Sequence, residues 1–520
     1  TGNSNTFIGG RSGAATTTGT ENTGVGQGSL FTNSTGGSNT ALGRGALLSN
    51  TTASNNTAVG RNSLNVNTTG TEHVAVDSLT LKANTTGNYN TAIGYNALTT
   101  NTTGDENTAV GNSALKLNTT GEYNTALGLG SLQNSTTSSN NTAVGHTALY
   151  SNTTGANNTA VGYFALLVNT TGTENVAVGQ VALDANTTGS YNTAIGRHSL
   201  SSATTASNNT AVGRNAMGDT TTGYDNVAVG RNALDANVGG HSNTALGESS
   251  LTSNTEGDRN VAVGQNALAI NSTGGSNVAV GRGALDANTT ASNNTAVGDL
   301  AASALTTGAA NVAIGTNALA ASTTGARNTI VGVDSSNQIS SGSDNTAVGY
   351  DSLTRCTTGG SNTCIGKDSG DNITNGALNT FVGIDSGTNI TQGSSHVCIG
   401  SSTITSAENS QNEIVIGASI TGVGSNSFTF GKASNIVSND FDTNASWTRA
   451  SDIRKKRNIK DDTLGLEFIN DLNTKTFQWK PNNEFPKEWD DYNEENKMNL
   501  DVVMHGLIAQ DVKSALDKQG

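Results

Sequence analysis

The positions of small, apolar and polar residues follow a fixed 17-residue period through most of this chain. One copy starts at Asn56 with the letters N-T-A-V-G, has Leu64 at its ninth position, and has N-T-T-G at positions 12–15. Residues taken at this interval from Gly9 to Gly417 are glycine at 24 of 25 places, and Asp77 is the exception. A fixed period of this kind is typical of solenoids and fibres, in which each repeat buries its faces by stacking on its neighbours.

Each repeat predicts one coil of a β-solenoid. Position 2 is Thr or Val and position 4 is β-branched or Leu, so these side chains share one side of a short strand while position 3 faces the other. The Asn, Thr and Gly residues at positions 12–15 supply a turn. Leucine at position 9 recurs from Leu30 to Leu285 in 16 consecutive coils, interrupted only by Met217. We expect these leucines to stack into an apolar core column, and the asparagines and threonines to form hydrogen-bonded ladders.

Alanine at position 3 recurs almost as regularly, from Ala41 through Ala313. One 17-residue coil encloses little apolar area, so a second close contact is expected, and the alanine row lies opposite the valine row. This pattern favours a homotrimer in which the alanine rows face the other chains. The alternative is that alanine only fits a cramped bend.

The repeat changes in its last coils. Small residues replace the leucine at position 9, isoleucine replaces asparagine at position 12, and position 3 becomes larger; we therefore expect the cross-section to change there. Cys364 and Cys398 share position 3 but lie two coils apart, about 9.6 Å at strand spacing, which is too far for a disulfide. The altered residues are Ser336, Gly370 and Gly387 at position 9, Ile339, Ile373 and Ile390 at position 12, and Ile330, Cys364 and Phe381 at position 3.

Composition divides the chain near residue 450, because all three Trp and both Pro lie beyond residue 446. The predicted fold class is all-β: a trimeric β-solenoid shaft at 1–417, a neck at 418–450 and a small α+β domain at 451–520. The net charge of −14 argues against a nucleic-acid partner. No apolar run approaches the length of a membrane-spanning helix, so we expect no membrane insertion. The six histidines occupy different repeat positions without metal-ligand spacing, so no metal or cofactor is expected. Thr1 falls inside a repeat, which suggests a fragment of a longer protein.

One stretch carries candidate chemistry. It is S-D-I-R-K-K-R-N-I at residues 451–459, followed by a predicted helix and strand at 464–481 and by H-G-L-I-A-Q-D-V at residues 505–512. This order of motifs resembles the endosialidase-type intramolecular chaperone domain of phage tail spikes and fibres. The 17-residue repeats resemble the head repeats of trimeric autotransporter adhesins and the shaft repeats of phage tail fibres.

The chaperone resemblance implies a serine self-cleaving domain that assists trimer folding and then releases itself. It assigns Ser451 as nucleophile and Lys456 as general base, with the cut at Ala450–Ser451; a cut on the other side of Ser451 stays open. Neighbouring cationic side chains would disfavour the protonated form of Lys456, as a general base requires. Family members usually continue beyond the last motif, so a chain that stops at Gly520 implies a truncated or abbreviated domain. The other family-motif positions are Asp452, Arg454, Asn458, Gly506 and Gln510.

The function predicted from these resemblances is a trimeric viral tail-fibre or spike shaft that attaches to a host. Its expected partners are two further copies of the chain, a host cell-surface receptor such as a glycan, and other tail proteins, and its expected location is the virion, outside the cell. One alternative is a trimeric adhesin on a bacterial surface. Another is a threonine-array solenoid of the ice-binding type, although the threonines in N-T-T-G are adjacent and lie in a turn. A glycan-cleaving enzyme would need paired carboxylates, which the repeats do not offer at regular positions.

Overall fold

The computed structural model describes residues 2–442, 466–488, 492, 494–495 and 500–518. The chain divides into two units, Thr1–Asn444 and Ala445–Gly520, and each is described by itself.

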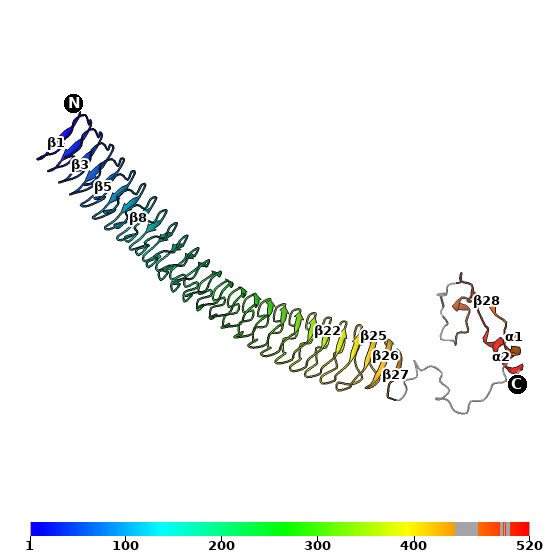
Figure 1. The fold of residues 1–520 in the computed structure, drawn as a ribbon. Coiled ribbons are helices and arrows are strands. Elements are labelled where there is room, and N and C mark those ends of the chain that lie inside the picture. Colours follow the sequence, from blue (N-terminus) through cyan, green and yellow to red (C-terminus); the bar gives the residue numbers. More distant parts are fainter. Residues whose placement is uncertain (1, 443–465, 489–491, 493, 496–499, 519–520) are drawn as a thin grey trace. The chain divides into compact units, whose positions relative to one another are not determined.

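The first unit is a β-solenoid with one coil per 17-residue repeat (Figure 1). Each repeat contributes a three-residue strand that pairs in parallel with the strand of the next repeat, as Thr57 does with Val74. The predicted period and coil are therefore confirmed. The strands are β1 (Thr6–Ile8), β2 (Thr23–Val25), β3 (Thr40–Leu42), β4 (Thr57–Val59), β5 (Val74–Val76), β6 (Thr91–Ile93), β7 (Thr108–Val110), β8 (Thr125–Leu127), β9 (Thr142–Val144), β10 (Thr159–Val161), β11 (Val176–Val178), β12 (Thr193–Ile195), β13 (Thr210–Val212), β14 (Val227–Val229), β15 (Thr244–Leu246), β16 (Val261–Val263), β17 (Val278–Val280), β18 (Thr295–Val297), β19 (Val312–Ile314), β20 (Thr329–Val331), β21 (Thr346–Val348), β22 (Thr363–Ile365), β23 (Thr380–Val382) and β24 (Val397–Ile399).

Three longer strands complete this sheet. Strand β25 (Ile414–Ala418) still pairs with β24 in the register of the repeats. Strand β26 (Ser427–Lys432) pairs in parallel with β25 at a shorter offset, with Phe428 opposite Ile414, and β27 (Asn435–Asp440) returns antiparallel to β26. The described part of the predicted neck thus continues the sheet and closes it with a hairpin.

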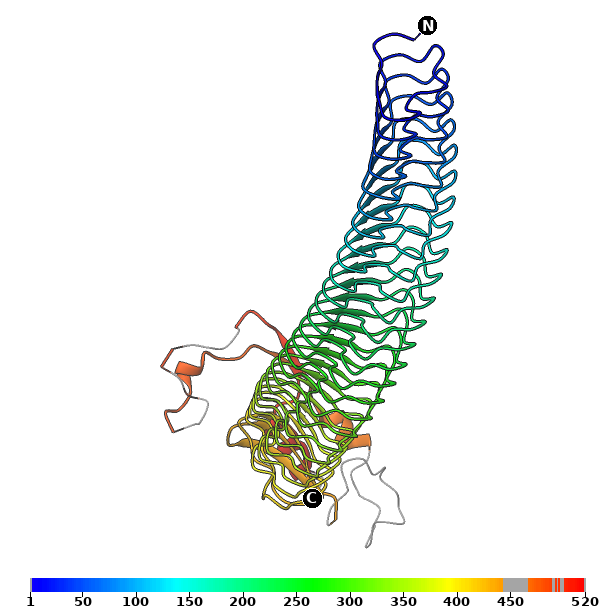
Figure 2. The same ribbon diagram turned by 90° about the vertical axis from the view of Figure 1, so that its left-hand side faces the viewer.

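The core is a column of position-9 leucines together with the alanines of positions 3 and 8. Leu64, Ala58 and Ala97 are examples, and all three are fully buried. The leucine column is as predicted. The predicted orientation of the alanine row is wrong: position 3 faces the inside of its own coil, while positions 2 and 4 face outward. The leucine fills the narrow coil, so position 3 has room only for a methyl group in most repeats. Figure 2 shows how the strands lie above one another along the unit.

Glycine at position 5 is required by the close approach of consecutive coils. Gly145 has a φ of +135°, and a Cβ added there would lie 2.4 Å from the carbonyl oxygen of Gly162 in the next coil. Asp77, the exception in this row, has a φ of 104°. The core leucines also have a left-handed backbone, with a φ of 47° at Leu64. Such a conformation is strained for a bulky residue, and burial of the side chain offsets the strain.

The strand pattern persists through the coils whose sequence changes. Phe381 and Ile390 are fully buried in the same 17-residue register, so apolar volume moves within the coil while its strand and its pairing stay the same. Cys364, Cys398 and Cys356 are free and buried, which confirms that Cys364 and Cys398 are not joined.

The second unit is a small α+β arrangement. It contains helix α1 (Leu466–Asp471), strand β28 (Lys475–Phe477), a 3₁₀ turn at Asn482–Glu484, strand β29 (Met504–Gly506) and helix α2 (Ala509–Lys518). The helix and strand predicted within 464–481 are present as α1 and β28. Strands β28 and β29 are antiparallel, with Thr476 opposite His505.

Candidate functional site

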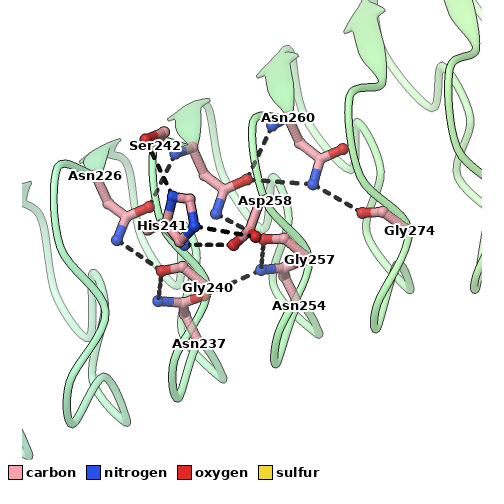
Figure 3. A network of polar contacts seen from close by, with 11 residues as sticks. Asn226, Asn237, Gly240, His241, Ser242, Asn254, Gly257, Asp258, Asn260 and Gly274 are labelled. Atoms are coloured by element: carbon pink, nitrogen blue, oxygen red, sulfur yellow. Dashed lines mark hydrogen bonds and ion pairs between the residues drawn. The ribbon is translucent and has the colours of Figure 1, made fainter.

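Two rows of buried asparagines hold the coils together on the inner side of the turn (Figure 3). At position 1, Asn243 donates its backbone N–H to Oδ1 of Asn226 at 2.9 Å, and its Nδ2 donates to the carbonyl of Gly257 at 2.8 Å. At position 12, Nδ2 of Asn254 donates to the same Gly257 carbonyl at 3.0 Å and to Oδ1 of Asn237, also at 3.0 Å. Each amide therefore links two coils, and the predicted asparagine ladders are confirmed.

Threonine at position 13 forms a third ladder. Thr68 donates both its backbone N–H and its hydroxyl to the carbonyl oxygen of Thr85, at 3.0 and 2.9 Å. These hydroxyls are engaged within the solenoid. The outward threonine row at position 2 is interrupted by valine, for example in β16 and β17.

Histidine replaces asparagine at position 1 in two coils, so the expectation that all six histidines occupy different positions is wrong for His73 and His396. Nδ1 of His73 accepts the backbone N–H of Asn90 at 3.2 Å, and Nδ1 of His396 accepts that of Glu413 at 3.1 Å. His396 Nε2 lies 2.8 Å from the carbonyl oxygen of Ser410, to which it donates in this tautomer. A neutral imidazole thus makes the same two links as an asparagine amide. Burial lowers the pKa of His73 to about 4 and also lowers the pKa of His396.

The three cysteine thiols are buried. Burial raises the pKa of the Cys356 and Cys398 thiols to about 12, so the reactive thiolate is strongly disfavoured. No cluster of three or more potential metal ligands occurs among the described residues. A search of the same residues finds no helix with the length and apolar character needed to cross a bilayer.

Most of the predicted self-cleavage residues lie outside the described residues: Ala450, Ser451, Asp452, Arg454, Lys456 and Asn458. Two of the motif positions are described. Gly506 ends β29, where a Cβ would lie 3.5 Å from the ring of Phe477, and Gln510 is exposed in the first turn of α2. Phe477 in turn meets Trp479 edge to face at a centroid distance of 5.6 Å.

The described residues of the second unit bury little apolar surface. Among its described residues only Ala515 and Asn482 are buried. Several large apolar side chains are exposed to solvent: Leu466 is 72% exposed and Ile469 is 62% exposed.

The N-terminal unit belongs, by its architecture, to the β-solenoids, and the segment after it carries a separate family signature. Residues 451–520 match the model of the family described as chaperone of endosialidase. This match supports the resemblance on which the predicted C-terminal domain rests. No curated protein matches the chain.

Proposed function

We propose that this chain forms the shaft of a trimeric phage tail fibre, and that its C-terminal segment guides three copies into register. The observation that carries the proposal is the order of parts: an unbroken β-solenoid is followed directly by a segment of the endosialidase-chaperone family. A shaft of this kind would be part of the virion tail, outside the cell, and would attach to a host cell-surface receptor.

The exposed apolar side chains of the C-terminal segment support assembly. Leu466, Ile469 and Val503 would leave water on contact with equivalent segments of two other copies, which stabilises association by the hydrophobic effect. Lys475 and Asp511, 3.9 Å apart, form an ion pair within the segment itself.

The solenoid offers a second surface for the other copies, which differs from the one expected from the sequence. Because the alanine row is buried inside each coil, the available apolar row is position 4, where Leu127 and Leu246 are both 47% exposed. These side chains stand above one another in the parallel sheet and carry no charge. We place the contacts between copies on this position-4 row.

Self-cleavage is part of the proposal. In the family resemblance, the Ser451 hydroxyl attacks the carbonyl carbon of Ala450 while Lys456 takes the hydroxyl proton. The C–N bond to Ser451 breaks, the released nitrogen takes up a proton, and water then hydrolyses the ester that has formed. Cutting after assembly would remove the chaperone segment and leave a shaft that cannot easily re-form once unfolded, which is a kinetic form of stability.

Assembly is tested by measuring the native mass of the whole chain. The same measurement is made on a variant of the position-4 row and on a control variant at position 17. We expect a mass of three chains, and loss of assembly when Leu127 and Leu246 are both replaced by Asp. The matched control is Leu378→Asp, because Leu378 is 62% exposed but lies at position 17 rather than on the position-4 row. A stable wild-type monomer would contradict the proposal, and an equal loss of assembly in the control would contradict the placement of the interface.

A further inference from the structure

One ridge of the solenoid varies from coil to coil while the frame beneath it repeats. In most coils positions 1–5, 9 and 12–15 keep their residue types, whereas position 6 is Arg44, Arg61, Tyr95 and Leu129 in four different coils. All four side chains are exposed. Because the frame does not depend on them, the side chains of positions 6, 7 and 10 are free to serve recognition.

A cavity opens on this ridge in the first coils. It has a volume of about 350 Å³ and is lined by Arg11, Arg44 and Arg61 together with Phe31 and Leu48 at position 10. This volume is within the range of small-ligand sites. Position 7 is glycine in two successive coils, Gly28 and Gly45, with φ of +70° and +69°. A Cβ added to Gly28 would meet only Leu48, at 3.6 Å, so the missing side chain leaves this part of the cavity open, whereas beside Gly45 the space is taken by the Asn62 side chain.

The arginines of the cavity differ from others on the same ridge. Arg282, also at position 6, pairs with Asp299 one coil later at 2.8 Å, and Arg231 pairs with Glu248 in the same way. Within the described residues, no ion pair is found for Arg11, Arg44 or Arg61, and no acidic residue lines the cavity. A concentration of unpaired positive charge on a chain of net charge −14 marks a site for a negatively charged group.

The apolar part of the cavity limits the kind of anion. The Phe31 ring is half-buried, and the guanidinium carbon of Arg11 lies 5.8 Å from its centroid, a distance typical of a cation–π contact. Leu48 is the second large apolar side chain among the lining residues, which also include the two position-6 arginines. Guanidinium groups bind carboxylates and phosphates with paired hydrogen bonds.

We propose that this cavity binds an acidic saccharide: a carboxylate or phosphate is held by Arg44 and Arg61, and the apolar face of a sugar ring packs on Phe31 and Leu48. The inference rests on the proposed function, since a fibre that attaches to a cell surface meets such saccharides there. The receptor would then carry acidic sugars, and the first coils of the solenoid would hold one of them.

The test is calorimetric titration of the whole chain with four probes: an oligogalacturonate, glucose 6-phosphate, a neutral galactose oligosaccharide and a single-stranded oligonucleotide. We expect binding of the oligogalacturonate or the sugar phosphate, which distinguishes a carboxylate from a phosphate source, and weaker binding at higher salt. Arg44→Gln combined with Arg61→Gln should weaken binding about tenfold or more, as expected for hydrogen bonds to charged groups. Inorganic phosphate is titrated in addition, as an anion without a sugar ring. Phe31→Ala should reduce the affinity for the acidic saccharide by a larger factor than the affinity for inorganic phosphate.

The matched control is Arg282→Gln, which removes an arginine of the same ridge that already has a carboxylate partner and should leave affinity unchanged. The inference is wrong if neither acidic probe binds, or if the neutral oligosaccharide binds as tightly as the acidic ones. It is also wrong if the oligonucleotide binds more tightly than the acidic saccharides, or if Arg282→Gln reduces the affinity as much as the cavity variants do. Native mass is measured on the same samples. A trimer that binds neither acidic probe contradicts this inference alone, whereas a monomer that binds one contradicts the proposed function alone.

Discussion

Phe381 and Gly387 exchange volume within one coil. The Phe381 ring occupies the place that a position-9 leucine fills in most other repeats, and a Cβ added to Gly387 would lie 2.3 Å from Cδ2 of that ring. Phe7 and Gly13 repeat the arrangement in the first coil, where the corresponding distance to Cδ2 is 2.6 Å. A large residue at position 3 therefore goes with a small one at position 9.

This exchange predicts a strong coupling between the two positions. Phe381→Ala should destabilise the solenoid by about 3–5 kcal/mol through the cavity it leaves, and Gly387→Leu should destabilise it by overpacking. The double variant restores the Ala and Leu of the common repeat and should recover most of the loss. Thermal unfolding of the four proteins measures the coupling; additive losses would refute the exchange.

The ladder at position 12 contains breaks that can be repaired. Oδ1 of Asn186 and the hydroxyl of Thr220 are both buried without a hydrogen-bond partner, and the residue between them in the row is Ala203. Ala203→Asn should supply an amide to Asn186 and an acceptor to Thr220, raising the free energy of unfolding by about 1–2 kcal/mol. The increase is read as a higher unfolding temperature. Ala203→Leu, which adds bulk without polar groups, should not raise it, and equal behaviour of the two variants would argue against the ladder as the cause.

The buried histidines predict a loss of stability in acid. The folded chain holds His73 neutral down to a pKa of about 4, whereas an unfolded histidine takes up a proton near pH 6.5. The unfolded state therefore binds more protons between these values, so this contribution is complete above pH 6.5 and declines as the pH falls toward 4, by roughly 3 kcal/mol.

Replacing His73 by Asn keeps both links to the neighbouring coils and removes the titrating group. The difference in unfolding temperature between pH 7.5 and pH 4.5 should shrink in this variant, and shrink further when His396 is also replaced by Asn. An unchanged difference in the double variant would exclude the histidines as its source.

Self-cleavage gives a prediction that gel electrophoresis can check. The assembled protein should release a fragment of about 70 residues, because Ser451 is assigned as the nucleophile beside the cut. Ser451→Ala and Lys456→Ala should each leave one full-length band, whereas Lys455→Ala should still be cut. Processing of the Ser451→Ala protein near residue 450 would show that another group or a separate protease makes the cut.

The sequence predicts the period, the leucine column and the asparagine ladders because each needs one residue type at one fixed place. It does not predict which side of the strand faces inward. In a three-residue strand, alternation separates Ala58 from Thr57 and Val59 but leaves both sides open. The Leu64 side chain fills the inside of the coil opposite Ala58, so only the small side of the strand can face inward. That Leu64 lies opposite Ala58 is known only from the closed coil. The left-handed backbone of Leu64 has no signal in the residue type, and the role of His73 emerges only when its two ring nitrogens are seen in place of an amide.

The strict pairing of each residue with its equivalent in the next repeat makes the length of the shaft countable in whole steps. Removing one complete repeat joins two equivalent coils, keeps every row aligned and shortens the rod by about 4.8 Å. Removing 16 or 18 residues instead of 17 shifts every later position by one place. At the junction, the core leucines then no longer stack on leucines and the asparagines no longer pair with asparagines. The length of the solenoid can therefore change by gain or loss of complete coils, without any change in the remaining coils or in the C-terminal segment.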